Sequence, residues 1–261
     1  IAILVINKGE FMALDFNQRS FTRTADQGVI DEGLRAYMLK VYNYMTTGLL
    51  ITGLIAYFFG KASIVTNSSG ELIGVTSLGN MLFNSPLMWV VALAPLGMMF
   101  FFTYRINRMS LSAAQITFWV FATLMGLSMA SLFIVYTGAS ITRVFFICSA
   151  TFAAMSLYGY TTKRDLTALG GFLMMGVIGL IIANIVNWFL QSPALYYAAS
   201  FIGVLIFVGL TAYDTQKIKN MYYEGDSENL SGKKAIMGAL TLYMDFILLF
   251  IYLLRIFGQR R

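Results

Sequence analysis

Two aspartates lie against or within apolar stretches, and their type and position make them the strongest candidates for chemistry. Ten of the twelve acidic residues lie in polar segments or at the flanks of apolar runs, which leaves Asp214 and Asp245. Asp245 lies in the middle of the apolar run 235–254, about 15 Å from its start at 1.5 Å per residue. A carboxylate at that depth in a membrane is costly unless it is protonated, paired or hydrated. We therefore interpret Asp245 as a functional residue.

Asp214 directly follows the apolar run 194–213, and two interpretations of it stay open. In the first it is a charge at the membrane interface. In the second it lies level with Asp245, which requires its helix to continue for about ten residues through Lys217 and Lys219, with both lysines facing a water-filled vestibule. The two carboxyl groups would then share a proton and titrate as a pair. Such a pair is a proton sensor that needs no histidine, and the chain has none.

The deprotonated pair also predicts weak, transient binding of calcium at Asp214 and Asp245. Calcium prefers 6–8 oxygen ligands and two carboxylates supply few of them, so permeation fits better than storage. We expect no other metal site and no cofactor. Two basic residues, Arg105 and Arg108, follow the second apolar run. They are either interface anchors or a counter-ion that reaches the aspartates and closes the path, and Arg105 is the stronger candidate for such a latch.

The elements that must position these residues are membrane spans. Of the 261 residues 58% are hydrophobic and only 11% are charged, with a mean hydropathy of +0.72, unlike a soluble domain. The chain contains seven apolar runs near the length that spans a bilayer, and runs of that length are helices, since barrel strands are about half as long. The sequence predicts an all-α membrane protein, a seven-transmembrane-helix bundle with tyrosines mainly as lipid-facing filler and interface anchors. The seven runs are 41–60, 86–104, 113–136, 144–160, 167–190, 194–213 and 235–254.

Lysines and arginines at the ends of the runs predict the orientation. With the N-terminus in the cytoplasm, thirteen lie on the cytoplasmic side and five outside. Three of those five follow the last run, which therefore either crosses the membrane against the rule or re-enters and returns. We expect a cytoplasmic tail, 1–35, and one transmembrane domain, 36–261. Codons for Lys8 to Glu10 can contain a ribosome-binding sequence, so we expect a native bacterial start at Met12, with 1–11 not native.

Several classes of function are excluded or disfavoured. The basic residues are scattered in ones and twos, so nucleic-acid binding is not expected. The single cysteine, Cys148, forms no internal disulfide, and the absence of histidine excludes His-based zinc and Ser-His sites. Intramembrane aspartyl proteases also use a Tyr-Asp on one helix and an Asp on the next. Their second motif resembles Gly-x-Gly-Asp, whereas Leu242, Tyr243 and Met244 precede Asp245 here, so we expect no enzymatic activity.

The two Asp motifs resemble a known pattern. Tyr213-Asp214-Thr215-Gln216 and the stretch Leu242-Tyr243-Met244-Asp245-Phe246 are similar to the C-terminal signature of the Bax inhibitor family (transmembrane Bax inhibitor motif proteins), and the seven-span plan is similar to its bacterial members. The resemblance implies a central seventh helix surrounded by the other six and a di-aspartyl pH sensor at Asp214 and Asp245. It also implies a pH-dependent calcium leak with a latch on Arg105 or Arg108.

Two functions follow as expectations. The first is a pH-regulated calcium or cation leak channel of the bacterial inner membrane, a monomer whose partners are the lipid bilayer, calcium ions and protons. The alternative is a non-transporting membrane regulator that binds and restrains a membrane AAA protease or a stress-response partner. It predicts that changing both aspartates leaves partner binding intact. A proton-coupled carrier is disfavoured because the sequence shows no repeated half.

Overall fold

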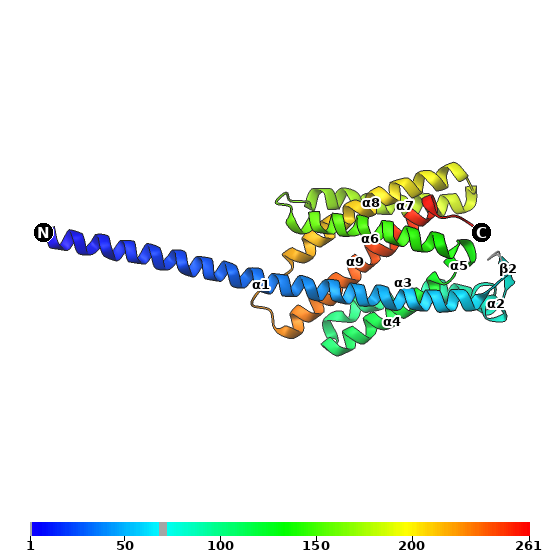
Figure 1. Cartoon of the computed structure of the whole chain (residues 1–261), viewed down its shortest axis with the longest axis horizontal. Helices are drawn as coiled ribbons and strands as arrows, with labels where there is room; N and C mark the ends of the chain where they lie inside the picture. The colour runs from blue at the N-terminus through cyan, green and yellow to red at the C-terminus, as the bar shows by residue number, and fades with distance from the viewer. Residues whose placement is uncertain (1, 68–71) are drawn as a thin grey trace.

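The computed structural model describes residues 2–67 and 72–261, and within these it describes the side chains of all residues except 2–31 and 107. The predictions of a start at Met12 and of a cytoplasmic tail over 1–35 fall mostly or wholly outside the described side chains. Figure 1 shows the arrangement of the elements. In chain order they are α1 (Ala2–Ser63), β1 (Ile64–Thr66), β2 (Leu72–Val75), α2 (Ser77–Phe83), α3 (Leu87–Arg105), the 3-10 turn η1 (Ile106–Arg108), α4 (Leu111–Met129), α5 (Leu132–Val135), α6 (Gly138–Thr161), α7 (Thr167–Leu190), α8 (Pro193–Asn220) and α9 (Glu228–Phe257).

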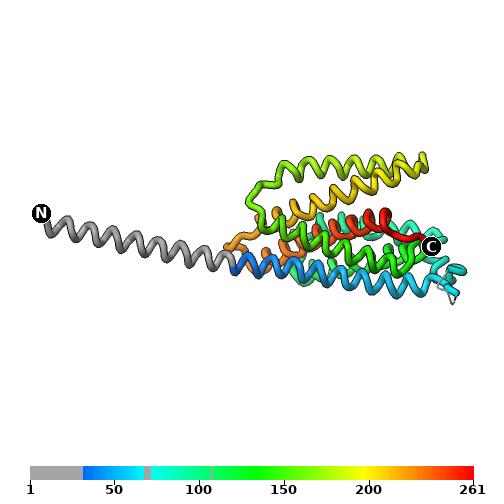
Figure 2. Tube along the Cα trace, turned by 45° about the horizontal axis from the view of Figure 1, so that its top comes forward, coloured from blue at the N-terminus to red at the C-terminus, as the bar shows by residue number. Residues whose placement is uncertain are grey.

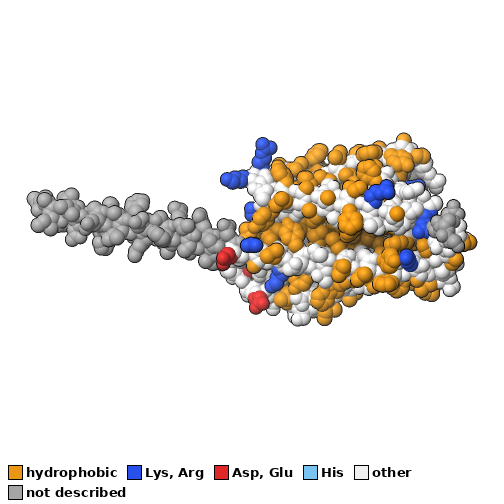
Figure 3. Space-filling model, in the orientation of Figure 1, with side chains coloured by type: hydrophobic (Ala, Val, Ile, Leu, Met, Phe, Trp, Pro, Cys, Tyr) orange, Lys and Arg blue, Asp and Glu red, His pale blue; other side chains and the backbone are white. Residues whose placement is uncertain are grey.

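Seven helical stretches in the described residues are long and apolar enough to cross a membrane, and each contains most or all of one predicted run. The all-α, seven-helix class is confirmed. On the face seen in Figure 3, lysines and arginines gather toward the two ends of the bundle, and most of the surface between them is apolar. Such a belt fits the hydrocarbon layer of a bilayer. The connection 61–85 adds a small antiparallel hairpin, β1–β2, and the short helix α2.

One predicted run is not a single helix. The run 113–136 is interrupted after Met129, and α5 begins only at Leu132. The Ala130 amide donates to the carbonyls of both Gly126 and Leu127, and the Ser131 hydroxyl donates to Ser128. Shorter hydrogen bonds of this kind tighten the last turn of a helix. The expectation of an unbroken helix over this run was wrong for that local reason.

The last helix, α9, is the core of the bundle. In its most apolar stretch 72% of the residues are buried, whereas no other span exceeds 39%. It packs against α1, α4, α6 and α8, while α3 packs mainly on α4 and α7 mainly on α8. In Figures 1 and 2 α7 lies along one edge of the bundle, with α9 inside. The central position of the seventh helix, which the resemblance implied, is confirmed.

The C-terminal segment settles whether the last run crosses or re-enters. One unbroken helix runs to Phe257, so the re-entrant alternative is wrong. The following residues lie along the turn between α5 and α6, where the Thr137 amide donates to Gln259 at 3.1 Å and the Arg261 amide donates to Val135 at 3.0 Å. The chain therefore ends at the opposite end of the bundle from the described start of α1, as Figure 1 shows.

Candidate functional site: a buried aspartate pair

Asp214 lies inside a helix rather than at its end. The helix α8 continues beyond the predicted run, through Lys217 and Lys219, and ends at Asn220. Asp214 is therefore buried, with 8% of its surface exposed. The Lys219 ammonium donates to the Tyr160 carbonyl of α6 at 2.8 Å, which holds the extended part of α8 against its neighbour. Of the two interpretations from the sequence, the structure agrees with the longer helix, although α8 continues only through 214–220 and not for about ten residues; the water-filled vestibule stays a prediction.

The structure brings Asp214 and Asp245 together. Asp245 is 5% exposed, within about 4 Å of the middle of α9 along its axis, and its carboxyl group lies within hydrogen-bonding reach of that of Asp214. Two carboxylates have only acceptors, so a hydrogen bond between them requires a proton on one of the two groups. The second oxygen of Asp245, Oδ2, has no hydrogen-bond partner among the described residues. The arrangement can therefore hold a proton and release it.

A cation that acts on Asp214 lies on the same helix as that residue, α8. Lys217, one turn after Asp214, is the positive charge whose field reaches the Asp214 carboxyl group. Arg105 ends α3 and Arg108 ends η1, and both are exposed. Neither is among the groups that act on the two aspartates in the described part of the chain. The arginine latch stays a prediction. Lys217 belongs to the site, and the sequence analysis did not assign it an effect on the two aspartates.

The residues next to Asp214 attach α8 to two other elements. The ring of Tyr213 packs against Gly170 of α7, where a Cβ would overlap with it. Gln216 binds the connection between α6 and α7 with both ends of its amide: its Oε1 accepts from the Leu166 amide at 2.9 Å and its Nε2 donates to the Arg164 carbonyl at 2.8 Å. The position of Asp214 is thus fixed from both sides along the chain.

A chain of hydroxyl groups joins α8 to α6 and α1. Thr215 donates to the Thr211 carbonyl at 2.7 Å. Each hydroxyl has one proton to donate, so Ser156 must donate to Thr215 across 3.0 Å and Tyr42 must donate to Ser156 across 2.6 Å. We call Tyr42, Ser156 and Thr215 the hydroxyl chain. Single serines and threonines inside apolar runs are its only signal in the sequence, and they carry no information on their partners.

Asp245 is positioned by a second polar contact on the central helix. The Tyr243 hydroxyl lies 2.7 Å from the Thr52 hydroxyl of α1, which itself donates to the Ala122 carbonyl of α4. The Tyr243 ring is fully buried and makes edge contacts with Phe118 and Phe121. Tyrosines were expected mainly at lipid-facing and interfacial positions, and for Tyr243 this was wrong. Its hydroxyl has an interhelical partner, which lets a polar group be buried in the bundle.

The carboxyl oxygens of Asp214 and Asp245 are too few to hold a cation other than weakly. Among the described residues no third His, Cys, Asp or Glu joins Asp214 and Asp245 to form a metal-binding group. A calcium ion bound here would need its remaining oxygens from water and carbonyl groups. The unpartnered Oδ2 of Asp245 is the acceptor that such a cation would meet.

The fold and the site define a seven-helix membrane protein with a buried carboxyl pair between its last two helices. Residues 34–261 match the model of a family described as "Inhibitor of apoptosis-promoting Bax1", and the chain belongs to this Bax inhibitor family. It is 49% identical over 243 residues to protein RP147 of Rickettsia prowazekii, and the aligned region covers 93% of this chain and 98% of the relative. It is 44% identical over 232 residues to the inner membrane protein YbhL of Escherichia coli K12, covering 88% and 94%. A Caulobacter vibrioides protein is 44% identical over 253 residues, covering 95% and 99%.

Proposed function

We propose that this protein is a pH-regulated leak channel for calcium or related cations, controlled by protonation of the Asp214–Asp245 pair. The observation that carries the proposal is the close approach of the two carboxyl groups, both buried, near the middle of the central helix. Protonated, the pair joins α8 to α9. Deprotonated, the two charges repel each other and favour any state in which water or a cation enters between them. A proton thereby biases a closed-to-open equilibrium.

We further propose that the channel lies in the bacterial inner membrane with its N-terminus in the cytoplasm. The relative YbhL is named an inner membrane protein, and the similarity covers 88% of this chain. The orientation rests on the excess of lysine and arginine at the end where α1 enters the bundle. The two charged residues that end α3 and η1, Arg105 and Arg108, belong to that excess.

Calcium flux into proteoliposomes across a pH series tests the proposal. The full chain is compared with Asp214→Asn, Asp245→Asn and the double variant, each checked for folding by circular dichroism. We expect a pH-dependent flux whose profile shifts or disappears in each single variant. The double variant should be no worse than the stronger single variant, because the two groups act as one unit.

Asp165→Asn is the matched control for removing a carboxylate. Asp165 lies between α6 and α7, outside the spans, and hydrogen bonds from the side chain and amide of Thr167 lower the pKa of its carboxyl group. Because the pKa of Asp165 is lowered and the residue lies outside the spans, its loss should leave the pH profile unchanged. Flux that keeps its pH profile in the double variant overturns the proposed sensor. Flux absent at every pH in folded protein overturns the channel and favours the regulator that restrains a membrane protease.

A further inference from the structure

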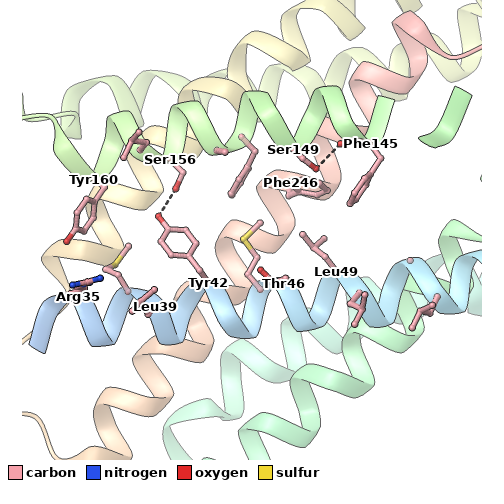
Figure 4. A pocket seen from close by; sticks show the side chains of 18 residues that line it. Arg35, Leu39, Tyr42, Thr46, Leu49, Phe145, Ser149, Ser156, Tyr160 and Phe246 are labelled. Atoms are coloured by element: carbon pink, nitrogen blue, oxygen red, sulfur yellow. Dashed lines mark hydrogen bonds between the residues drawn. The ribbon is translucent and has the colours of Figure 1, made fainter. Parts of the chain in front are cut away.

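A groove between α1 and α6 opens on the outer wall of the bundle. It has a volume of about 900 Å³, within the range of small-molecule sites, and its lining is almost entirely apolar. Figure 4 shows Arg35 and Tyr160 facing each other at one end, with Phe145 and Phe246 toward the other. The Tyr42 side chain reaches from α1 to Ser156 on α6 within it.

The groove extends over little more than one leaflet of a bilayer. Along α1 its lining runs from Arg35 to Leu54. The apolar run 41–60 of this helix has its midpoint near residue 50, so the groove begins about 23 Å on one side of that midpoint and ends about 5 Å beyond it. A leaflet with its headgroups is roughly 20–22 Å thick, whereas a partner helix would cross both leaflets. The dimensions therefore fit a lipid molecule better than a transmembrane segment.

The charge of the groove lies at the headgroup end. Among its lining residues Arg35 is the one that carries a charge, and none is acidic. A second cation, Lys219, lies 5.0 Å from the ring centroid of Tyr160 at the same end. The exposed Glu32 lies one turn before Arg35 and is not part of the lining. Two cations at headgroup depth attract an anionic lipid.

We propose that the groove binds one phospholipid with an anionic headgroup, whose phosphate lies at Arg35 and one of whose acyl chains lies between α1 and α6 as far as Phe246. Phe246 follows Asp245 directly, and Tyr42 is the first member of the hydroxyl chain that ends at Thr215, next to Asp214. The lipid thus contacts the residue next to Asp245, and it contacts the hydroxyl chain two hydroxyl groups away from Thr215, the neighbour of Asp214. The proposal concerns binding alone and does not depend on channel activity.

Native mass spectrometry of the purified full chain tests whether an acyl chain binds in the groove. The probes are phosphatidylglycerol and phosphatidylcholine with identical acyl chains. Gly53 lines the groove, and a Cβ there meets nothing within 4 Å, so Gly53→Leu adds its side chain to the groove from a position that accepts a Cβ. Gly179 on α7 has the same open space outside the groove, so Gly179→Leu is the matched control. We expect Gly53→Leu to weaken binding of phosphatidylglycerol at least fivefold and Gly179→Leu to leave it unchanged. Ala153→Leu, on the opposite wall, repeats the test should Gly53→Leu fail to fold.

The headgroup is tested by charge removal. We expect the unaltered chain to retain one phosphatidylglycerol with at least a fivefold preference over phosphatidylcholine. Arg35→Gln should weaken the preference clearly, and Lys163→Gln, an exposed lysine at the same end, should keep it. Equal binding by the Gly53 and Gly179 variants, or a preference that is the same in Arg35→Gln as in the unaltered chain, overturns the proposal. A dimer that dissociates only in Gly53→Leu also overturns it and assigns the groove to a second copy of the chain.

Discussion

The hydroxyl groups of Thr52 and Tyr243 lie 2.7 Å apart and join the first span to the central helix two residues before Asp245. Thr52 also donates to the Ala122 carbonyl, so its proton is used and Tyr243 must be the donor in the pair. Three helices, α1, α4 and α9, therefore meet at one small buried polar contact.

Tyr243→Phe removes the donor of this contact and leaves the ring in place. We expect a loss of about 0.5–1.5 kcal/mol in the free energy of unfolding, measured by titration with a denaturing detergent in mixed micelles. Thr52→Val should cost more, because it also removes the donor to the Ala122 carbonyl and leaves the buried Tyr243 hydroxyl without an acceptor, and the double variant should cost clearly less than the two losses added together. Strictly additive losses would show that the two hydroxyl groups do not interact.

Gly159 of α6 and Ala212 of α8 pack backbone to backbone, two residues before Asp214. A Cβ on Gly159 would overlap with the Ala212 carbonyl, so Gly159→Ala must push the two helices apart. We expect it to lower the free energy of unfolding by about 1–3 kcal/mol. Gly171→Ala is the control, because a Cβ there meets nothing within 4 Å. Alanine favours helix over glycine by roughly 0.5–1 kcal/mol, so the control should be neutral or stabilising. The same unfolding titration measures both variants and shows whether their changes in the free energy of unfolding differ in this way. Equal changes in the two variants would contradict the close approach of Gly159 and Ala212.

Lys217 favours the ionised form of Asp214 because the two opposite charges attract each other. In Lys217→Gln the pair should keep its shared proton to a higher pH, and the midpoint of the proposed pH-dependent flux should move upward. Lys217 is exposed, so solvent screens the interaction and the shift should be less than about one pH unit. Flux in proteoliposomes measures it, with Lys163→Gln as the control for loss of an exposed cation. A downward shift, or the same shift in both variants, would rule out this role for Lys217.

Gln216 holds the connection between α6 and α7 through the Leu166 amide and the Arg164 carbonyl. Gln216→Met keeps the length of the side chain and removes both hydrogen bonds. We expect amide hydrogen exchange of a peptide covering 162–168 to become about 3- to 10-fold faster, as the loss of a hydrogen bond worth roughly 1 kcal/mol implies. A peptide covering the α7–α8 connection, 190–193, lies at the other end of both helices and should exchange as before. Unchanged exchange at 162–168 would show that Gln216 does not hold this connection.

Most of the fold could be predicted because the apolar runs match the thickness of a bilayer. All seven runs correspond to spans, and the differences lie at their ends, where charged residues continue a helix beyond the apolar part, as at Lys217 and Lys219. Hydropathy reports the apolar portion of a helix and not its full length. The break after Met129 was missed for a different reason, since it depends on local hydrogen bonds in an apolar stretch.

The candidate site could be predicted only in part. The two aspartates were identified because carboxyl groups in apolar segments are costly. Their contact, the field of Lys217 and the partners of Tyr243 depend on which helix faces touch, and spacing along one helix does not determine this. The latch at Arg105 or Arg108 remains a prediction, because both arginines lie exposed at the end of α3 and η1 in the described structure.

The four consecutive residues Tyr213 to Gln216 face four different neighbours: α7, α9, α6 and the connection between α6 and α7. Successive side chains on a helix are about 100° apart, so these contacts surround α8 on all sides. A rotation of α8 about its own axis would break all of them together, whereas a small tilt or a bend could separate Asp214 from Asp245 and keep the other three. Opening of the proposed aspartate pair should therefore proceed by a tilt or bend that moves α8 and α9 apart at Asp214, and not by rotation of α8 about its own axis.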